Sequence, residues 1–218
     1  MKLTKTLLTT VLFGASVFSF QSTAWAIEQS QLIQVEQLYK QKNFKAALAI
    51  IHPLAEQCDV IAQVLLGSVY QKGHGVKQDD VEAVKWYRQA AEQGLALAQY
   101  NLGVMYTYGR GVKQDDVEAV KWYRQAAEQG NAKAQVNLGV MYAKGQGVKQ
   151  DDVEAVKWFR QAAEQGDTDA QTLLGFSYLL GTGIQVNKAL AKEWLGKACD
   201  NGDQQGCEYY GQLNRGER

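Results

Sequence analysis

Proline is nearly absent from this sequence: Pro53 is the only one, whereas glycine occurs 21 times. A chain with so little proline can form uninterrupted helices, and its turns must be made by glycine. An excess of one charge is also missing, because 23 basic residues face 23 acidic ones and the two signs alternate along the chain. No basic stripe accumulates, so nucleic acid is not an expected partner.

The residue patterns of familiar active sites are missing as well. The only histidines, His52 and His74, have no cysteine or histidine at metal-ligand spacing, and we expect His74 to be a solvated loop residue. The serines after residue 26, Ser30, Ser68 and Ser177, lack the lysine three places on that serine β-lactamases require. The sequence therefore predicts no catalytic residues, no metal site and no cofactor.

The first 26 residues are typical of a secretory signal peptide. Lys2 and Lys5 precede an apolar run over residues 7–20, and Ala24-Trp25-Ala26 is a small-x-small cleavage site. The run is too short to be a membrane span. We expect cleavage near Ala26 and a periplasmic or secreted chain of net charge 21 − 23 = −2 without a membrane span.

A 20-residue stretch, residues 75–94, returns unchanged at 111–130 and, with one substitution, at 147–166. A fixed period of 36 residues is typical of solenoids, in which each unit buries its apolar face against the next. Each period contains an apolar stripe of helical spacing, such as Ala98-Leu102-Tyr106, and then a second helical stretch. We call these helix A and helix B; the fold class is all-α.

Polar and glycine residues mark the helix ends. One register, occupied by Asp79, Asp115, Asp151 and Asn187, predicts the N-cap of helix B, and the glutamate three places on, as in Glu82, suggests a capping box. Glycines in one register, such as Gly94, are expected to end helix B.

Glycine pairs such as Gly109/Gly111 connect helix A to helix B. They lack the preceding strand of a phosphate-binding loop and predict turns of positive φ. Glycine within helix A, as at Gly103, suggests close approach between helices. Trp86, Trp122, Trp158 and Trp194 share one register and are interpreted as packing residues.

These signals divide the chain into seven segments. They are a signal peptide (1–26), a divergent N-terminal helical hairpin (27–58), four repeats (59–94, 95–130, 131–166 and 167–202) and a C-terminal capping helix with a tail (203–218).

With its 36-residue pattern of AQxxLGxxYxxGxGVxxDxxxAxxWxxxAAxxG, the chain resembles the Sel1-like repeat family, a relative of tetratricopeptide repeats. The resemblance implies a right-handed superhelix of antiparallel helix pairs that acts as a protein-interaction scaffold.

The last repeat is similar to cysteine-rich secreted Sel1 proteins of some pathogens. That likeness implies a disulfide between Cys199 and Cys207, in keeping with an oxidising compartment. The remaining cysteine, Cys58, stands where other repeats have their helix-ending glycine. It is either a buried small residue or a free thiol able to link two chains. We expect a monomer, with a Cys58-linked dimer as the alternative.

Helix B is nearly copied between repeats, whereas helix A varies on one side, and helix A lines the concave groove in tetratricopeptide-like superhelices. The variable positions are our candidate surface for a protein or peptide partner, with Asn101 and Asn137 suited to hold a peptide backbone. The alternative explanation is drift at exposed positions. The candidate residues are Leu97, Tyr100, Asn101, Tyr108, Lys133, Asn137, Lys144, Asp169 and Thr172.

The predicted function is an exported scaffold, engaged in host-cell interaction or envelope signalling. The alternative is β-lactam binding or hydrolysis, as described for cysteine-rich relatives.

Overall fold

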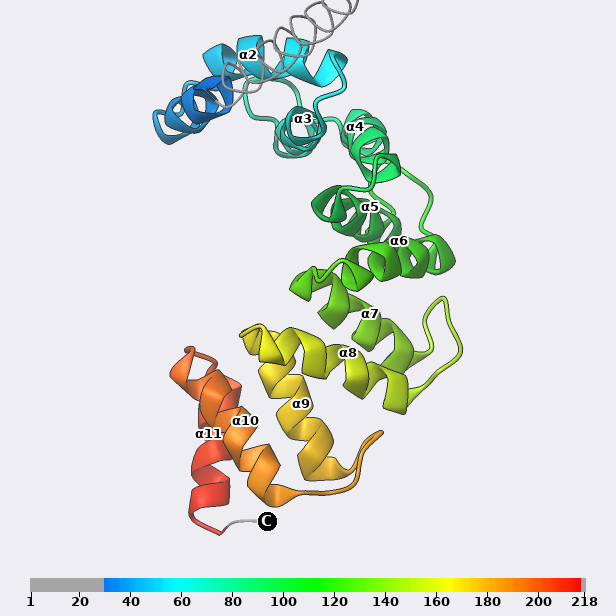
Figure 1. Ribbon diagram of the computed structural model, residues 1–218, viewed down its shortest axis with the longest axis vertical. Coiled ribbons are helices and arrows are strands. Elements are labelled where there is room, and N and C mark those ends of the chain that lie inside the picture. The colour runs from blue at the N-terminus through cyan, green and yellow to red at the C-terminus, as the bar shows by residue number, and fades with distance from the viewer. Residues whose placement is uncertain (1–29, 217–218) are drawn as a thin grey trace, which may run out of the picture. The chain divides into compact units, whose positions relative to one another are not determined.

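The computed structural model describes residues 30–216 (Figure 1). The predicted signal peptide and its cleavage site lie outside these residues. Contacts divide the chain into two compact units, one ending at Gln78 and one beginning at Asp79. The described residues form helices and turns without a β-strand, which confirms the all-α prediction.

The first unit contains a helix over residues 30–40, α2 (Phe44–Glu56) and α3 (Val60–Lys72). The helices α2 and α3 begin at polar caps, because the side chains of Asn43 and Asp59 each accept a hydrogen bond from an amide in the first turn. The two helices pack against each other.

In the first unit one expectation is wrong, and one choice between alternatives is decided. His74 is not a solvated loop residue: its ring stacks on Phe44 at 4.3 Å between centroids and meets Tyr39 edge-on at 6.1 Å. Cys58 is not buried: it is exposed and takes a φ of 68°, the left-handed conformation that glycine adopts at this register in the other repeats. Of the two interpretations of Cys58, the structure supports the free thiol.

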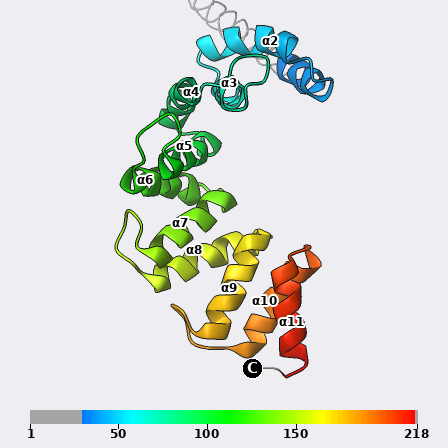
Figure 2. The same cartoon turned by 180° about the vertical axis from the view of Figure 1, so that it is seen from behind.

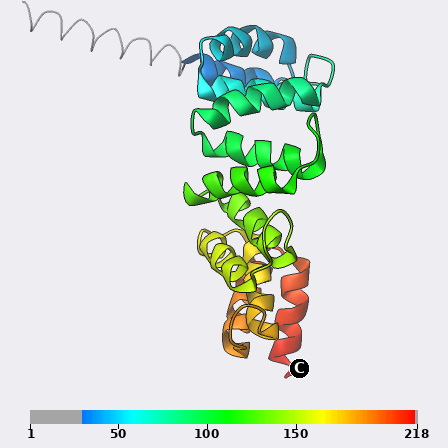
Figure 3. The same ribbon diagram turned by 90° about the vertical axis from the view of Figure 1, so that its right-hand side faces the viewer.

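The second unit is a series of short helices, joined by tight turns from B to A and by longer loops from A to B. Each helix packs mainly on the next one in the chain, and Figure 1, the view from behind (Figure 2) and the view from the side (Figure 3) show them in chain order. The helices are α4 (Asp80–Glu92), α5 (Ala96–Tyr108), α6 (Asp116–Glu128), α7 (Ala132–Lys144), α8 (Asp152–Glu164), α9 (Thr168–Leu180), α10 (Lys188–Asp200) and α11 (Gln204–Asn214). The even-numbered ones are the predicted B helices and the odd-numbered ones the A helices.

The predicted N-caps of the B helices are confirmed. The side chains of Asp79, Asp115, Asp151 and Asn187 accept from the amide three residues on, at 2.9–3.0 Å. The capping box is not formed as expected. The amide of Asp115 donates to the carbonyl of Tyr106, and Glu118 pairs with Lys121 instead.

The paired glycines make turns of positive φ, as predicted, and the second of each pair has a further role. Gly111 has a φ of 67°, and a Cβ there would overlap the carbonyl oxygen of Asp80, in the preceding B helix. Gly147 and Gly183 lie in the same way against Asp116 and Asp152. Each of these three turns therefore packs against the first residue of the B helix one repeat earlier.

The glycines within the A helices make room for a side chain. A Cβ on Gly103 would lie 2.7 Å from the ring of Tyr123, and one on Gly139 would lie 2.5 Å from the ring of Phe159. The expected close approach therefore exists, and it is made mainly by the aromatic ring on helix B.

The tryptophan register fills the seam between repeats. Trp158 packs against the buried cluster that contains Ala119, Tyr123 and Leu138, and Trp194 packs against the next cluster, which contains Phe159 and Leu174. The packing role predicted for these residues is confirmed at these two positions. In the described part of the chain, no helix has the length and apolar character needed to cross a membrane.

Candidate binding groove

A cavity of about 440 Å³ opens on the face of the A helices between α5 and α7, and we call it the central cavity. Three of the predicted groove residues, Tyr108, Asn137 and Lys144, line it. The other lining residues are Thr107, Gln114, Asp116, Tyr123, Val140, Met141 and Gln146.

Tyr123 lines this cavity although only 1% of its surface is exposed. Its hydroxyl lies 3.0 Å from that of Thr107, which in turn donates to the carbonyl of Gly103. Burial raises the pKa of Tyr123 to about 12, against the opposing effect of its hydrogen-bond contacts with Thr107 and Asn137. The phenol is therefore uncharged at neutral pH.

The rim of the central cavity carries groups that a ligand could use. Tyr108 is 66% exposed, with the guanidinium of Arg110 at 5.4 Å from its ring centroid. Asp116 and Lys144 bring one charge of each sign, and neither belongs to an ion pair among the described residues. The cavity is thus polar and can recognise both hydrogen-bonding and charged groups.

Other predicted residues lie along the same helices outside the central cavity. Leu97 is 48% exposed near the start of α5. Tyr100 and Asn101 are half-buried on α5, and the ring of Tyr100 lies 6.1 Å from that of Tyr123. Burial raises the pKa of the Tyr100 hydroxyl.

Three predicted residues are engaged within the protein. Lys133 on α7 reaches Asp167 at 3.0 Å and Asp169 at 3.2 Å, next to the start of α9. These contacts, led by the hydrogen bond to Asp167, raise the pKa of Lys133. Thr172 is 7% exposed, and its hydroxyl donates to Asp203 at 2.9 Å, so it offers little surface to a ligand.

A second cavity, of about 260 Å³, lies between α9 and α11 at the start of α10, and we call it the C-terminal cavity. Its wall includes an edge-to-face contact of Phe176 with Tyr209, whose centroids are 4.7 Å apart. Leu180 is 70% exposed at its rim. The lining residues are Phe176, Leu179, Leu180, Lys188, Tyr209, Gln212 and Leu213.

Buried glutamines on the A helices hold the junctions between each B helix and the A helix that follows it. The amide of Gln135 donates to the carbonyl of Ala127 at 3.1 Å, and its oxygen accepts from Gln165 at 2.8 Å. Gln99 and Gln171 make the corresponding bonds in their repeats.

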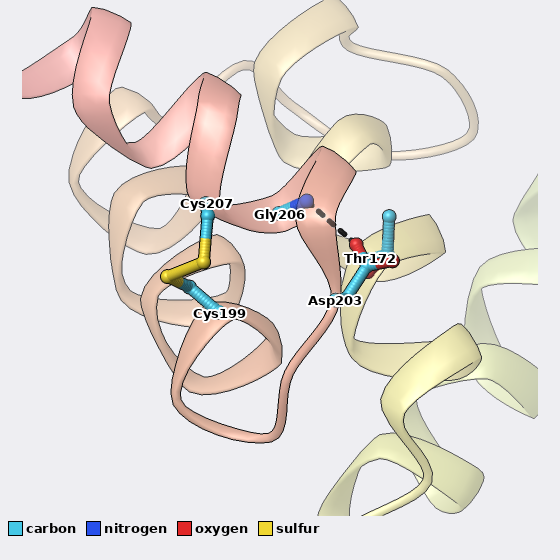
Figure 4. The surroundings of a disulfide bond; sticks show 5 residues. All are labelled: Thr172, Cys199, Asp203, Gly206 and Cys207. Atoms are coloured by element: carbon cyan, nitrogen blue, oxygen red, sulfur yellow. Dashed lines mark hydrogen bonds between the residues drawn. A yellow bond between two sulfur atoms is a disulfide. The ribbon is translucent and has the colours of Figure 1, made fainter.

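At the last junction a disulfide joins Cys199 to Cys207, as predicted, with 4.3 Å between their Cα atoms (Figure 4). The carboxylate of Asp203 begins α11 by accepting from the amide of Gly206 at 2.6 Å and also binds Thr172 (Figure 4). The α9, α10 and α11 helices are therefore linked on both sides of the turn.

Sequence reasoning missed the C-terminal cavity and the participation of Asp116. Leu179 and Leu180 do belong to the variable helix-A positions that define the candidate surface, although they are not among its candidate residues. Asp116 is not among the predicted residues, because helix capping already accounts for the acidic residues at the start of a B helix. Among residues 30–216 no three His, Cys, Asp or Glu side chains gather as metal ligands.

Comparison with known proteins identifies the repeat. The Sel1 repeat family model matches residues 60–95, 96–131, 132–167 and 168–203. Each match begins one residue after the corresponding boundary expected from the sequence.

Two solved structures are similar over most of the chain. A Sel1 repeat protein from Oxalobacter formigenes is 38% identical over 82% of this chain and 73% of its own, with a TM-score of 0.76. The protein c5321, described as a protective antigen of uropathogenic Escherichia coli strains with an SLR fold, is 38% identical over 84% of this chain, with a TM-score of 0.75. The match covers 43% of c5321, so the chain spans less than half of that protein's length. No curated protein matches the chain.

Proposed function

The chain belongs to the Sel1 repeat family of helical scaffolds, and from this premise we propose that it is exported and binds a partner protein through the face of its A helices. We name the binding surface the groove; it consists of the central cavity, the C-terminal cavity and the A-helix residues between them.

One observation carries this proposal. Both cavities are lined mainly by A helices, where the repeats differ, whereas three of the B helices, α4, α6 and α8, are nearly identical copies. A surface that is hollowed and chemically varied suits recognition of an extended segment, whose successive side chains meet different residues. Exposed Tyr108 and Leu180 support this, because large apolar side chains in contact with water favour association.

Export is supported by the character of the first 26 residues and by the Cys199–Cys207 disulfide, which is stable in an oxidising compartment. The similarity to c5321, a protective antigen, is in keeping with a chain that acts in the envelope or outside the cell. Sequencing of the N-terminus of the fractionated protein is expected to begin at Ile27. Recovery of the uncleaved chain with reduced cysteines in the cytoplasm would contradict export.

A site-specific photo-crosslinker tests the groove. Placed at Tyr108 it is expected to trap a partner protein in intact cells, or in host-cell extract if the partner is a host protein. The matched control places it at Val117, a residue 65% exposed on a B helix. Equal crosslinking at both positions, or none at Tyr108 in either setting, would refute the groove assignment.

The exposed thiol of Cys58 supplies a separate test of assembly. We propose that the chain is a monomer. Size-exclusion chromatography under non-reducing and reducing conditions should give the same monomeric mass. A dimer that disappears on reduction, and in Cys58→Ser, would replace this part of the proposal.

We further propose that the groove acts by binding alone. Turnover of nitrocefin by the purified protein would contradict this.

A further inference from the structure

The two cavities of the groove are built on the same positions of the repeat, two repeats apart. Six of the seven residues that line the C-terminal cavity have a counterpart lining the central cavity. The corresponding pairs are Thr107 and Leu179, Tyr108 and Leu180, Asp116 and Lys188, Asn137 and Tyr209, Val140 and Gln212, and Met141 and Leu213. The fold has therefore made one kind of subsite twice.

All six pairs differ, and two of the changes bear most on the choice of ligand. The threonine and tyrosine at the end of α5 are replaced by Leu179 and Leu180, so hydrogen-bonding groups give way to an aliphatic surface. The charge at the start of the following B helix is reversed, since Lys188 takes the place of Asp116. The C-terminal cavity thus combines an apolar wall with one cation.

The lysine at this position departs from the rest of the protein. Helices α4, α6 and α8 each have two acidic residues in the first turn, whereas α10 has none and begins with Lys188. Lys188 is exposed and belongs to no ion pair among the described residues. Its ammonium group is available to an anion outside the chain.

The apolar wall is open to water. Leu180 is 70% exposed, and the cavity volume of about 260 Å³ is many times the space that one water molecule needs. Covering this wall with a large apolar side chain would remove apolar surface from water on both partners.

We propose that the C-terminal cavity is the apolar anchor subsite of the groove, which takes a large apolar side chain of a peptide with a carboxylate next to it. The carboxylate faces Lys188, and the side chain packs on Phe176, Leu180 and Leu213. The charge of Lys188 disfavours a basic segment at this position. This inference rests on the proposed function and specifies the ligand of one part of the groove.

N-acetyl-leucine is the minimal probe, since it joins one such side chain to one carboxylate. Titrated into the isotopically labelled protein, it is expected to shift the NMR signals of α9, the start of α10 and α11, with a dissociation constant on the order of millimolar. N-acetyl-leucinamide lacks the charge and should bind at least about threefold more weakly. N-acetyl-serine lacks the apolar group and should give no shifts there.

Two exposed substitutions test the assigned contacts. Lys188→Glu is expected to weaken N-acetyl-leucine by about threefold or more and to leave N-acetyl-leucinamide unchanged. Leu180→Ser should weaken both probes by about fivefold. Lys149→Glu, in an exposed turn residue that lines neither cavity, is the control and should change nothing.

Shifts spread over the surface, or equal affinity for the acid and the amide, would overturn the proposal. A self-associated protein that dissociates in Lys188→Glu would also overturn it, because a second copy would then be the occupant. If any of these results occurred while the crosslinker at Tyr108 still trapped a partner, the groove would stand and only this subsite assignment would fail.

Discussion

The α6–α7 junction and the α10–α11 junction solve one packing problem in two ways. At the first, Gln135 donates to the carbonyl of Ala127, eight residues earlier. At the second, the same two registers are Cys207 and Cys199, which are joined covalently. The glutamine also accepts from Gln165 at the end of α8 and therefore links three successive helices, α6, α7 and α8. The disulfide joins only its own two helices.

The difference shows that two properties of a repeat junction are separate. The first is its strength, and the second is its continuity, by which we mean the number of successive helices that it connects. A disulfide restricts the unfolded chain locally. A buried glutamine contributes less, but it connects three successive helices instead of two. In a solenoid, where stability is approximately a sum of unit and interface terms, the second property determines how cooperatively the repeats unfold.

Removing the disulfide should have the largest effect. We expect Cys199→Ser with Cys207→Ser to lower the stability of the α10–α11 region by roughly 2–3 kcal/mol, because a closed loop restricts the unfolded chain. Amide hydrogen exchange of α11 measures this. Reduction of the unmodified protein is the control and should give the same loss of protection. Unchanged exchange of α11 would mean that packing alone holds the helix.

Removing a glutamine should cost somewhat less and act over a longer range. Gln135→Leu takes a side-chain donor from the carbonyl of Ala127 and an acceptor from Gln165, so we expect a loss of about 2 kcal/mol. Urea unfolding gives the total, and hydrogen exchange should show weaker protection in both α6 and α8. Gln146→Leu, at an exposed turn residue, is the control. An effect confined to α7 would refute the idea of continuity.

Replacing the hydrogen-bonded α6–α7 junction by a disulfide tests whether the two kinds of junction are interchangeable. Ala127→Cys with Gln135→Cys should form a disulfide, because the two positions have the registers of Cys199 and Cys207. The oxidised variant is expected to be about 1 kcal/mol more stable than the original protein, since the covalent link outweighs the lost hydrogen bonds. Its reduced form should be less stable than the original. Thiol titration and urea unfolding check both statements, and failure to oxidise would show that the junctions differ in geometry.

The ion pairs that Lys133 makes with the next repeat should matter least, although the side chain of Asp167 is only 5% exposed. Lys133 is 57% exposed, so Lys133→Ala is expected to cost less than about 1 kcal/mol, and salt should reduce the difference. Because the folded-state pKa of Lys133 is raised, its contribution is present below the ordinary lysine pKa and is lost as the pH rises through the folded-state value. Urea midpoints at two salt concentrations measure it, with Lys149→Ala as the control. A larger, salt-independent loss would indicate a packing role.

The sequence was sufficient for features that depend on a single turn of chain. Asp115 caps its helix and Gly111 takes a positive φ because neighbouring backbone alone determines both. The disulfide came from likeness to cysteine-rich relatives. Tyr108, Asn137 and Lys144 were chosen because their registers vary, and they line one cavity. Whether they bind a ligand stays a prediction.

Features that depend on how two helices pack could not be predicted from the sequence. The bond from Gln135 to Ala127 requires the side chain to lie in the helix junction, and the only sequence signal is a glutamine repeated beside an apolar stripe. His74 was misjudged because its partner, Phe44, lies 30 positions away in the sequence. Thr172 was chosen as a variable position, but its hydroxyl binds the cap of α11.

The glycines that pack against the start of the preceding B helix restrict how such a chain can evolve. Gly111, Gly147 and Gly183 each fit against a carbonyl one repeat earlier, and they recur every 36 residues. Duplication or deletion of one whole repeat recreates this fit, whereas an insertion of any other length at the turn disrupts it. The separation of the two cavities can therefore change only in whole-repeat steps. If the groove binds an extended segment, as we propose, related chains would accommodate a discrete set of ligand lengths.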